Sequence, residues 1–264
     1  MTSTSIGSWL SYAQHRTGFN TIAGSVMVLP HVHSPQLNNQ RDIVVYLPPS
    51  HSVGERRYPV IYMQDGQNLF DEATGFGGWE WHVDETLETL SQAGLEAIAV
   101  GIPHAGDDRL SEYSPFDGIR PGRGDAYLSF ITDTAKPLID AAFLTRPGRK
   151  HTGLFGSSMG GLISLYGFFS RPEAFGFTGA MSPALWYARG AIYRFVREAP
   201  FNAGRIYLDH GSRESSAVRM SKLLVEKGYR PGEDMVYVNE DGGEHNEAAW
   251  ARRLPDALRF LLRP

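Results

Sequence analysis

One serine stands in a setting that can turn its hydroxyl into a nucleophile. Ser158 is the central residue of the sequence Gly-Ser-Ser-Met-Gly at positions 156–160. In a Gly-x-Ser-x-Gly turn the serine sits at a sharp passage from strand to helix, where a side chain at either glycine would collide with it. A chain with 29 glycines could contain this short pattern by chance, with an idle serine in a strand–helix turn. The surroundings favour the chemical interpretation, because a buried-type strand at 152–155 precedes the turn and a helix-type run at 162–166 follows it.

A serine hydroxyl needs a base, because it is not deprotonated near neutral pH. In folds that use this turn, an acid and then a histidine follow the serine, each on a turn after a later strand. Glu214 and His245 occupy two such places. We expect His245 to take the proton from Ser158 as the general base, and Glu214 to orient the imidazole. Asp209, at the end of the strand before Glu214, is the rival acid.

The negative charge that forms on the substrate oxygen also needs hydrogen-bond donors. In these folds one donor lies next to the nucleophile and another in the loop after the third strand. That loop is Gln-Asp-Gly-Gln-Asn at 64–68, and Gly66 lets its backbone N–H groups turn inward. We therefore expect the backbone amides of Gln67 and Met159 to form an oxyanion hole.

Short β-rich runs alternate with helix-type segments, which predicts an α/β fold with a mostly parallel sheet of about eight strands flanked by helices. The first two strands, 24–29 and 42–47, are expected to pair antiparallel. The other predicted strands are 58–63, 97–102, 152–155, 177–181, 205–208 and 235–238, and the predicted helices are 83–90, 127–142, 159–169, 216–227 and 247–262.

Two long segments, 64–78 and 103–125, are predicted to be loops, either functional or disordered. A chain of 264 residues without a repeat or linker indicates a single domain, 1–264. We expect its first 20 residues to be only loosely attached.

Composition excludes several classes of function. The net charge of −4 is spread without runs of one sign, so nucleic acid and anionic membranes are not expected partners. The absence of cysteine excludes disulfides, thiol catalysis and thiolate metal sites.

His31 and His33 would share one face of a strand, but no third ligand is evident, so no metal and no cofactor are expected. Neither a signal peptide nor a membrane span is visible, which predicts a cytoplasmic protein.

Four blocks of the sequence resemble a known family: 58–71 (YPVIYMQDGQNLFD), 96–116 (EAIAVGIPHAGDDRLSEYSPF), 151–162 (HTGLFGSSMGGL) and 244–260 (EHNEAAWARRLPDALRF). They are similar to the putative esterase family, which includes enterochelin-esterase-like and esterase D-like α/β-hydrolases. The resemblance implies an α/β-hydrolase fold without a large cap domain and cofactor-independent hydrolysis of carboxylic esters. It places the family's catalytic motif positions on Ser158, Glu214 and His245, and its oxyanion loop on 65–67. Members of the family vary between Asp and Glu as the acid, and some use only serine and histidine.

Two further residues are candidates for contact with a small-molecule ester. Arg109 follows the fourth predicted strand and could bind an anionic or catecholic group, or form an ion pair with Glu112 instead. Trp186 follows the sixth strand and suits a flat or acyl ligand, or packing against the 103–125 loop.

The predicted function is a serine esterase that forms an acyl-enzyme on Ser158. Two alternatives stay open: acyl transfer to an alcohol on the same site, and a catalytically silent fold that serves as a binding module. The sequence gives no indication of the oligomeric state.

Overall fold

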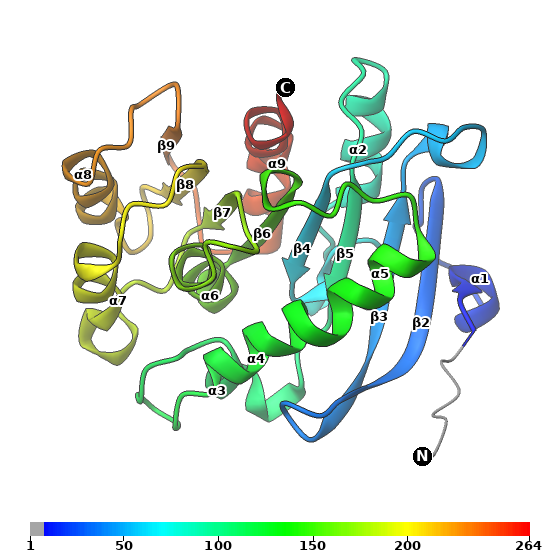
Figure 1. The fold of residues 1–264 in the computed structure, drawn as a ribbon, viewed down its shortest axis with the longest axis horizontal. Coiled ribbons are helices and arrows are strands. Elements are labelled where there is room, and N and C mark those ends of the chain that lie inside the picture. Colours follow the sequence, from blue (N-terminus) through cyan, green and yellow to red (C-terminus); the bar gives the residue numbers. More distant parts are fainter. Residues whose placement is uncertain (1–7) are drawn as a thin grey trace.

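The computed structural model describes residues 8–264 (Figure 1). The described residues form one nine-stranded sheet in the order β1-β2-β3-β5-β4-β6-β7-β8-β9. The strands are β1 Leu10–Ser11, β2 Ser25–Ser34, β3 Asn39–Leu47, β4 Val60–Gln64, β5 Ile98–Ile102, β6 Thr152–Ser157, β7 Phe177–Met181, β8 Arg205–Gly211 and β9 Met235–Glu240. Pairing is antiparallel from β1 to β3 and between β3 and β5, and parallel across the rest of the sheet. The predicted antiparallel first pair and the mostly parallel sheet are confirmed.

The helices of the described residues are α1 Tyr12–His15, α2 Val83–Ser91, α3 Arg109–Glu112, α4 Gly124–Phe130, α5 Lys136–Ala142, α6 Ser158–Ser170, α7 Tyr187–Glu198, α8 Val218–Glu226 and α9 Glu247–Leu262. A π-helical turn, Ile131–Ala135, joins α4 and α5, so the helix predicted over 127–142 is continuous but not uniform. Helix α7 was not predicted. Residues 188–190 at its start have positive φ angles, which interrupt the regular helical periodicity there.

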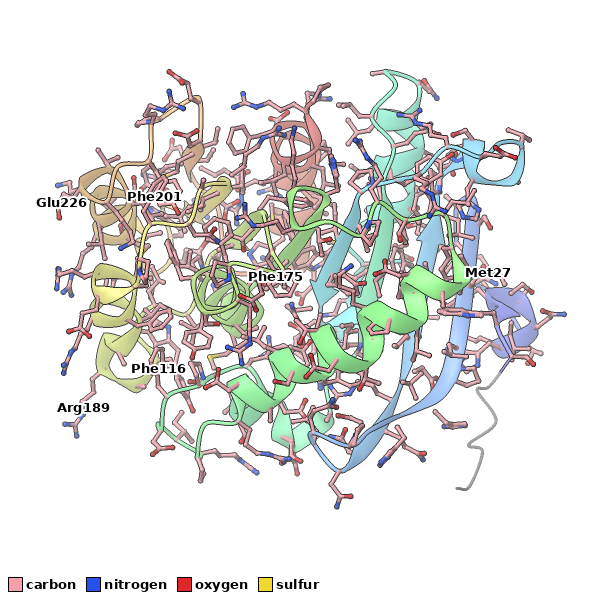
Figure 2. The ribbon with its side chains drawn as sticks, viewed as in Figure 1. Met27, Phe116, Phe175, Arg189, Phe201 and Glu226 are labelled. Carbon is pink, nitrogen blue, oxygen red and sulfur yellow. The ribbon has the colours of Figure 1, made fainter. Side chains whose placement is uncertain are left out.

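Two hydrophobic cores hold the helices on opposite faces of the sheet. Side chains of α4 to α8 pack on one face, and those of α2 and α9 pack on the other (Figure 1). Successive residues of β4 alternate between them, because Val60 and Tyr62 belong to the first core and Ile61 and Met63 to the second. This burial on both faces explains why the parallel strands are continuous apolar runs. Figure 2 shows Phe175, which is fully buried, among the packed side chains beside α6, whereas Arg189 and Glu226 project outward.

Of the first 20 residues, which we expect to be loosely attached, residues 1–7 lie outside the described part of the chain, residues 13–19 are exposed, and Leu10–Tyr12 are attached to the sheet. Strand β1 pairs with β2 through Leu10 and Val28, which adds a strand to the eight expected. Tyr12 is buried, and its hydroxyl donates a 2.6 Å hydrogen bond to Asp71 Oδ2. A buried aromatic side chain with a satisfied hydroxyl fixes this segment against the loop after β4.

Strands β4, β6, β7 and β8 are parallel, so their carboxyl ends meet at one edge of the sheet. Asp65, Ser158 and Ser182 each directly follow one of these strands, and Glu214 lies three residues beyond β8. Ligand sites of open α/β sheets form at this edge. Among residues 8–264, no helix has the length and apolar character needed to cross a membrane.

Candidate active site

Ser158 lies on a strained turn between β6 and α6. Its φ angle is +54°, in the left-handed region that non-glycine residues rarely adopt. A Cβ on Gly156 would lie 2.6 Å from the carbonyl carbon of Gly160, and a Cβ on Gly160 would lie 2.8 Å from Gln64 Cβ. Both glycines are therefore required by the tightness of the turn, as the sequence pattern predicts.

Glu214 and His245 meet across the ends of β8 and β9. His245 Nδ1 lies 2.5 Å from Glu214 Oε2. The imidazole is partly exposed, with 43% of its side chain accessible, whereas the Glu214 carboxylate is 4% accessible. Because a carboxylate only accepts, this contact assigns the proton of neutral imidazole to Nδ1 and leaves Nε2 as a proton acceptor.

A serine that sequence reasoning missed supports the other oxygen of Glu214. Ser182 Oγ donates to Glu214 Oε1 at 2.6 Å and accepts hydrogen bonds from Trp250 Nε1 and Arg253 Nη2, both at 2.9 Å. The Gly211 amide also donates to Glu214 Oε1, at 2.5 Å. Burial acts to raise the pKa of Glu214, but the hydrogen bonds from His245, Ser182 and Gly211 outweigh it and lower that pKa below its usual value.

The rival acid, Asp209, is engaged elsewhere. Its side chain is fully buried, and Oδ2 forms an ion pair with Arg253 Nε at 2.9 Å. Its Oδ1 accepts from the Ser182 amide at 2.9 Å. Burial raises the pKa of Asp209 to about 6, opposed by the charge of Arg253. Asp209 thus holds the arginine that supports Ser182, and the geometry favours Glu214 as the partner of His245.

The predicted oxyanion residues both lie at the start of helical turns. Gln67 is in a one-turn 3-10 helix, Gly66–Asn68, whose hydrogen bond runs from the Asn68 amide to the Asp65 carbonyl. Gly66 packs on the backbone of β5, where a Cβ would lie 2.5 Å from the Gly101 carbonyl carbon. The Met159 amide belongs to the first turn of α6, where N–H groups have no partner within the helix. The hydrogen bonds of these two helical turns thus do not use the N–H group of Gln67 or of Met159.

One cavity of about 320 Å³ brings Ser158, His245 and Gln67 together. It is lined by Asp65, Gln67, Asn68, Phe76, His104, Arg109, Ser157, Ser158, His245, Glu247 and Trp250. The ring of Trp250 lies edge-on to His245, with centroids 5.0 Å apart. Within residues 8–264, no hydrogen bond joins Ser158 Oγ to His245. Catalytic hydrogen bonds are often long without substrate and tighten in the substrate complex.

Arg109 lies in this cavity, but its partner differs from the one considered from the sequence. Its Nε and Nη2 bind Asp65 at 2.7 and 2.8 Å, so an ion pair with Glu112 does not form. Glu112 is instead buried in a bidentate pair with Arg41, both contacts at 2.9 Å. Arg109 is thus held by Asp65 where it lines the cavity.

The structure places Trp186 outside the cavity of Ser158. Its side chain is 59% exposed and lines another surface hollow, together with residues 117–119 and 187–189. The 103–125 loop lies beside it, as in the alternative considered from the sequence. Trp186 lies five residues beyond the end of β7, just before α7, and not directly at the edge of the sheet.

Known proteins share the sequence pattern and the fold of this chain. The sequence model of the family described as "Putative esterase" matches residues 34–261, which is most of the chain. The chain belongs to the putative esterase family. The predicted family, the α/β-hydrolase fold and a carboxylic ester hydrolase are thereby confirmed.

Relatives and solved structures extend over much of the chain. The uncharacterized protein YbbA of Bacillus subtilis is 29% identical over 84% of this chain and 92% of its own length. A siderophore enterobactin esterase of Emericella nidulans is 29% identical over 60% of this chain and 59% of its own.

Among solved structures, the BES protein from Bacillus cereus has a TM-score of 0.71 at 21% identity, covering 94% of this chain and 99% of that one. The enterobactin esterase of Shigella flexneri has a TM-score of 0.69 at 21% identity, covering 90% of this chain and 58% of that one. This chain thus spans about three fifths of the Emericella and Shigella proteins.

Proposed function

We propose that this esterase hydrolyses a small carboxylic ester through an acyl-enzyme on Ser158, with His245 as general base and Glu214 as the acid that orients it. The observation that carries the proposal is the 2.5 Å contact between Glu214 Oε2 and His245 Nδ1. It leaves Nε2 as the proton acceptor in the cavity that Ser158 also lines. A cytoplasmic location stays a prediction.

The first half-reaction transfers the acyl group to the enzyme. Ser158 Oγ attacks the carbonyl carbon of the ester while its proton passes to His245 Nε2. The backbone amides of Gln67 and Met159 donate to the oxyanion of the tetrahedral intermediate. The intermediate collapses as His245 returns the proton to the leaving alcohol, and the acyl group stays on Ser158.

Water completes the cycle by the same route in reverse. His245 takes a proton from a water molecule, the hydroxide oxygen attacks the acyl carbon, and the bond to Ser158 Oγ breaks. The proton on His245 returns to Ser158 Oγ as the carboxylic acid leaves. Glu214 stays ionised throughout and stabilises the imidazolium that forms twice per turnover.

The cavity supports an aromatic or siderophore-like ester as the substrate. Phe76, which is 75% exposed, supplies an apolar ring, and Arg109 supplies a fixed positive charge for a phenolate, catecholate or carboxylate group. Similar proteins are described as esterases of the siderophores enterobactin and triacetylfusarinine C, and one solved structure as a ferulic acid esterase.

The proposal is tested with p-nitrophenyl esters of rising acyl length beside feruloyl and catechol-type esters, compared between wild type, Ser158→Ala and Ser157→Ala. Ser157 is the matched control, because it lines the same cavity one residue away. We expect Ser158→Ala to lose about 10³-fold or more of the activity and Ser157→Ala to keep most of it. Equal activity of Ser158→Ala and wild type would exclude the mechanism. Ester product in excess of free acid when an alcohol is added would favour acyl transfer.

A further inference from the structure

Three carboxylates gather at the start of α2, away from the residues that line the cavity of Ser158. Glu80, Asp84 and Glu85 each have a carboxylate oxygen within 4.8 Å of the others. Glu80 is 1% exposed and Asp84 is fully buried. Burying several like charges together is unfavourable unless something compensates them.

Each carboxylate uses one oxygen within the protein and leaves the other without a partner. Glu80 Oε1 accepts from Thr21 Oγ1 at 2.5 Å, Asp84 Oδ2 from the Ala23 amide at 2.7 Å, and Glu85 Oε1 lies 3.4 Å from a ring nitrogen of His82. Their second oxygens, Glu80 Oε2, Asp84 Oδ1 and Glu85 Oε2, are buried without a hydrogen-bond partner among residues 8–264. Three unpartnered oxygens in one cluster are unusual, because buried polar atoms are nearly always satisfied.

The described part of the chain offers little positive charge to this cluster. Among residues 8–264, the only basic side chain within 4.0 Å of these carboxylates is the imidazole of His82, at 3.5 Å from Glu80 and 3.4 Å from Glu85. The described residues therefore leave most of the negative charge of this cluster uncompensated.

We propose that Glu80, Asp84 and Glu85 bind a divalent cation, each through one carboxylate oxygen, and that Ca²⁺ fits the spacing of the cluster. Ca²⁺ takes carboxylate oxygens at about 2.3–2.6 Å, so two of its ligands can lie about 4.8 Å apart. Mg²⁺ binds at about 2.0–2.1 Å and needs a tighter, octahedral set. Water completes the six to eight ligands that Ca²⁺ takes.

The position of the site gives the cation a structural role. Trp81, between two of the cluster's residues, donates its amide to the Asn68 carbonyl at 2.9 Å, and the Val83 amide donates to the Leu69 carbonyl at 3.1 Å. Thr21 and Ala23 attach the N-terminal segment to the same carboxylates. A bound Ca²⁺ would thus join this segment, α2 and the loop that carries Gln67.

Thermal unfolding and calorimetric titration of chelator-treated full-length protein test the site. We expect Ca²⁺ to raise the unfolding midpoint of wild type by several degrees and to bind one per chain, with a smaller response to Mg²⁺. Terbium, a luminescent substitute for Ca²⁺, should show emission excited through the neighbouring tryptophan and displaced by Ca²⁺.

Variants separate a bound cation from a shared proton. Glu80→Gln and Asp84→Asn should lose the response to Ca²⁺, and Asp84→Asn should unfold at a higher temperature than calcium-free wild type because the repulsion is relieved. Glu173→Gln, at an exposed carboxylate elsewhere, should respond as wild type does. The proposal is overturned if millimolar Ca²⁺ neither binds nor stabilises wild type, if Glu80→Gln responds as strongly as wild type, or if Mg²⁺ gives the larger effect.

Discussion

Ser182 Oγ donates a 2.6 Å hydrogen bond to Glu214 Oε1, and this contact links the acid of the site to α9. The hydroxyl has one proton and two lone pairs, and all three are used, because it accepts from Trp250 and Arg253. Trp250 in turn lies edge-on to His245. The side chains that hold the acid and the base therefore form one connected unit.

Replacing Ser182 with alanine should weaken catalysis without abolishing it. The variant removes a hydrogen bond to a carboxylate, an interaction of about 1.5–3 kcal/mol, so we expect kcat/KM to fall about tenfold or more. The loss of a donor to Glu214 should also raise the pH at which that carboxylate protonates. Steady-state kinetics across pH check this, and an unchanged rate and pH profile would show that Ser182 does not support the acid.

Glu214→Gln and Asp209→Asn should have opposite signatures. Glutamine can present an N–H to His245 and select the wrong tautomer, so kcat should fall about 10⁴-fold with little change in stability. Asparagine at 209 removes the fully buried ion-pair partner of Arg253 and leaves that arginine with Glu240, so the free energy of unfolding should fall by up to about 3 kcal/mol. Kinetics and denaturant unfolding of both variants measure these effects. A larger loss of kcat in Asp209→Asn than in Glu214→Gln would make Asp209 the acid.

Much of this site could be predicted because it depends on short-range geometry. Ser158, Glu214 and His245 each follow a strand whose apolar run is legible in the sequence, and parallel strands bring their carboxyl ends together. The two glycines around Ser158 could be recognised because the tight turn there has no room for a Cβ atom. The choice between Glu214 and Asp209 could not be made, because it depends on Arg253, which is far along the chain and selects Asp209 through packing.

The supporting contacts were beyond sequence reasoning for the same reason. The hydrogen bond from Arg253 to Ser182 joins positions 71 residues apart, and a serine after β7 has no pattern that distinguishes it from others. An ion pair between Arg109 and Glu112 is plausible from the sequence, because they are three residues apart. In the folded protein Arg109 instead pairs with Asp65, and Glu112 pairs with Arg41. Trp186 follows a strand as expected, yet it lines another part of the surface, because the path of the residues between β7 and Trp186 has no local pattern that predicts it.

Activity and stability should be lost at different pH values as the pH falls. Because the hydrogen bonds of Glu214 lower its pKa in the folded state, its carboxylate contributes stability above about pH 4, and this contribution is lost as pH falls through the folded-state value. Activity should fall at a higher pH than this, because histidine side chains in general take up a proton between about pH 5 and 8 and imidazolium cannot accept the serine proton. Parallel profiles of kcat/KM and unfolding midpoint measure both. An acid limb of activity well below about pH 5 would contradict a histidine base.

Arg109→Met should discriminate between charged and neutral substrates. If Arg109 binds an anionic group of the substrate, KM for a carboxylate- or catecholate-bearing ester should rise about tenfold, the scale of one charge-assisted contact. The neutral p-nitrophenyl ester of similar size is the internal control, because damage to the Asp65 loop would affect both substrates. An equal change for both esters would show that Arg109 holds Asp65 in place and does not bind an anionic group of the substrate.

Covalent trapping tests the central mechanism most directly. Fluorophosphonate should add once to wild-type protein, and peptide mapping by mass spectrometry should place the adduct on Ser158 in the peptide that also contains Ser157. Ser157→Ala should label as wild type does, Ser158→Ala should not label, and His245→Ala should label far more slowly because its serine lacks a base. Labelling of Ser158→Ala at the wild-type rate, or an adduct on any other residue, would contradict Ser158 as the nucleophile.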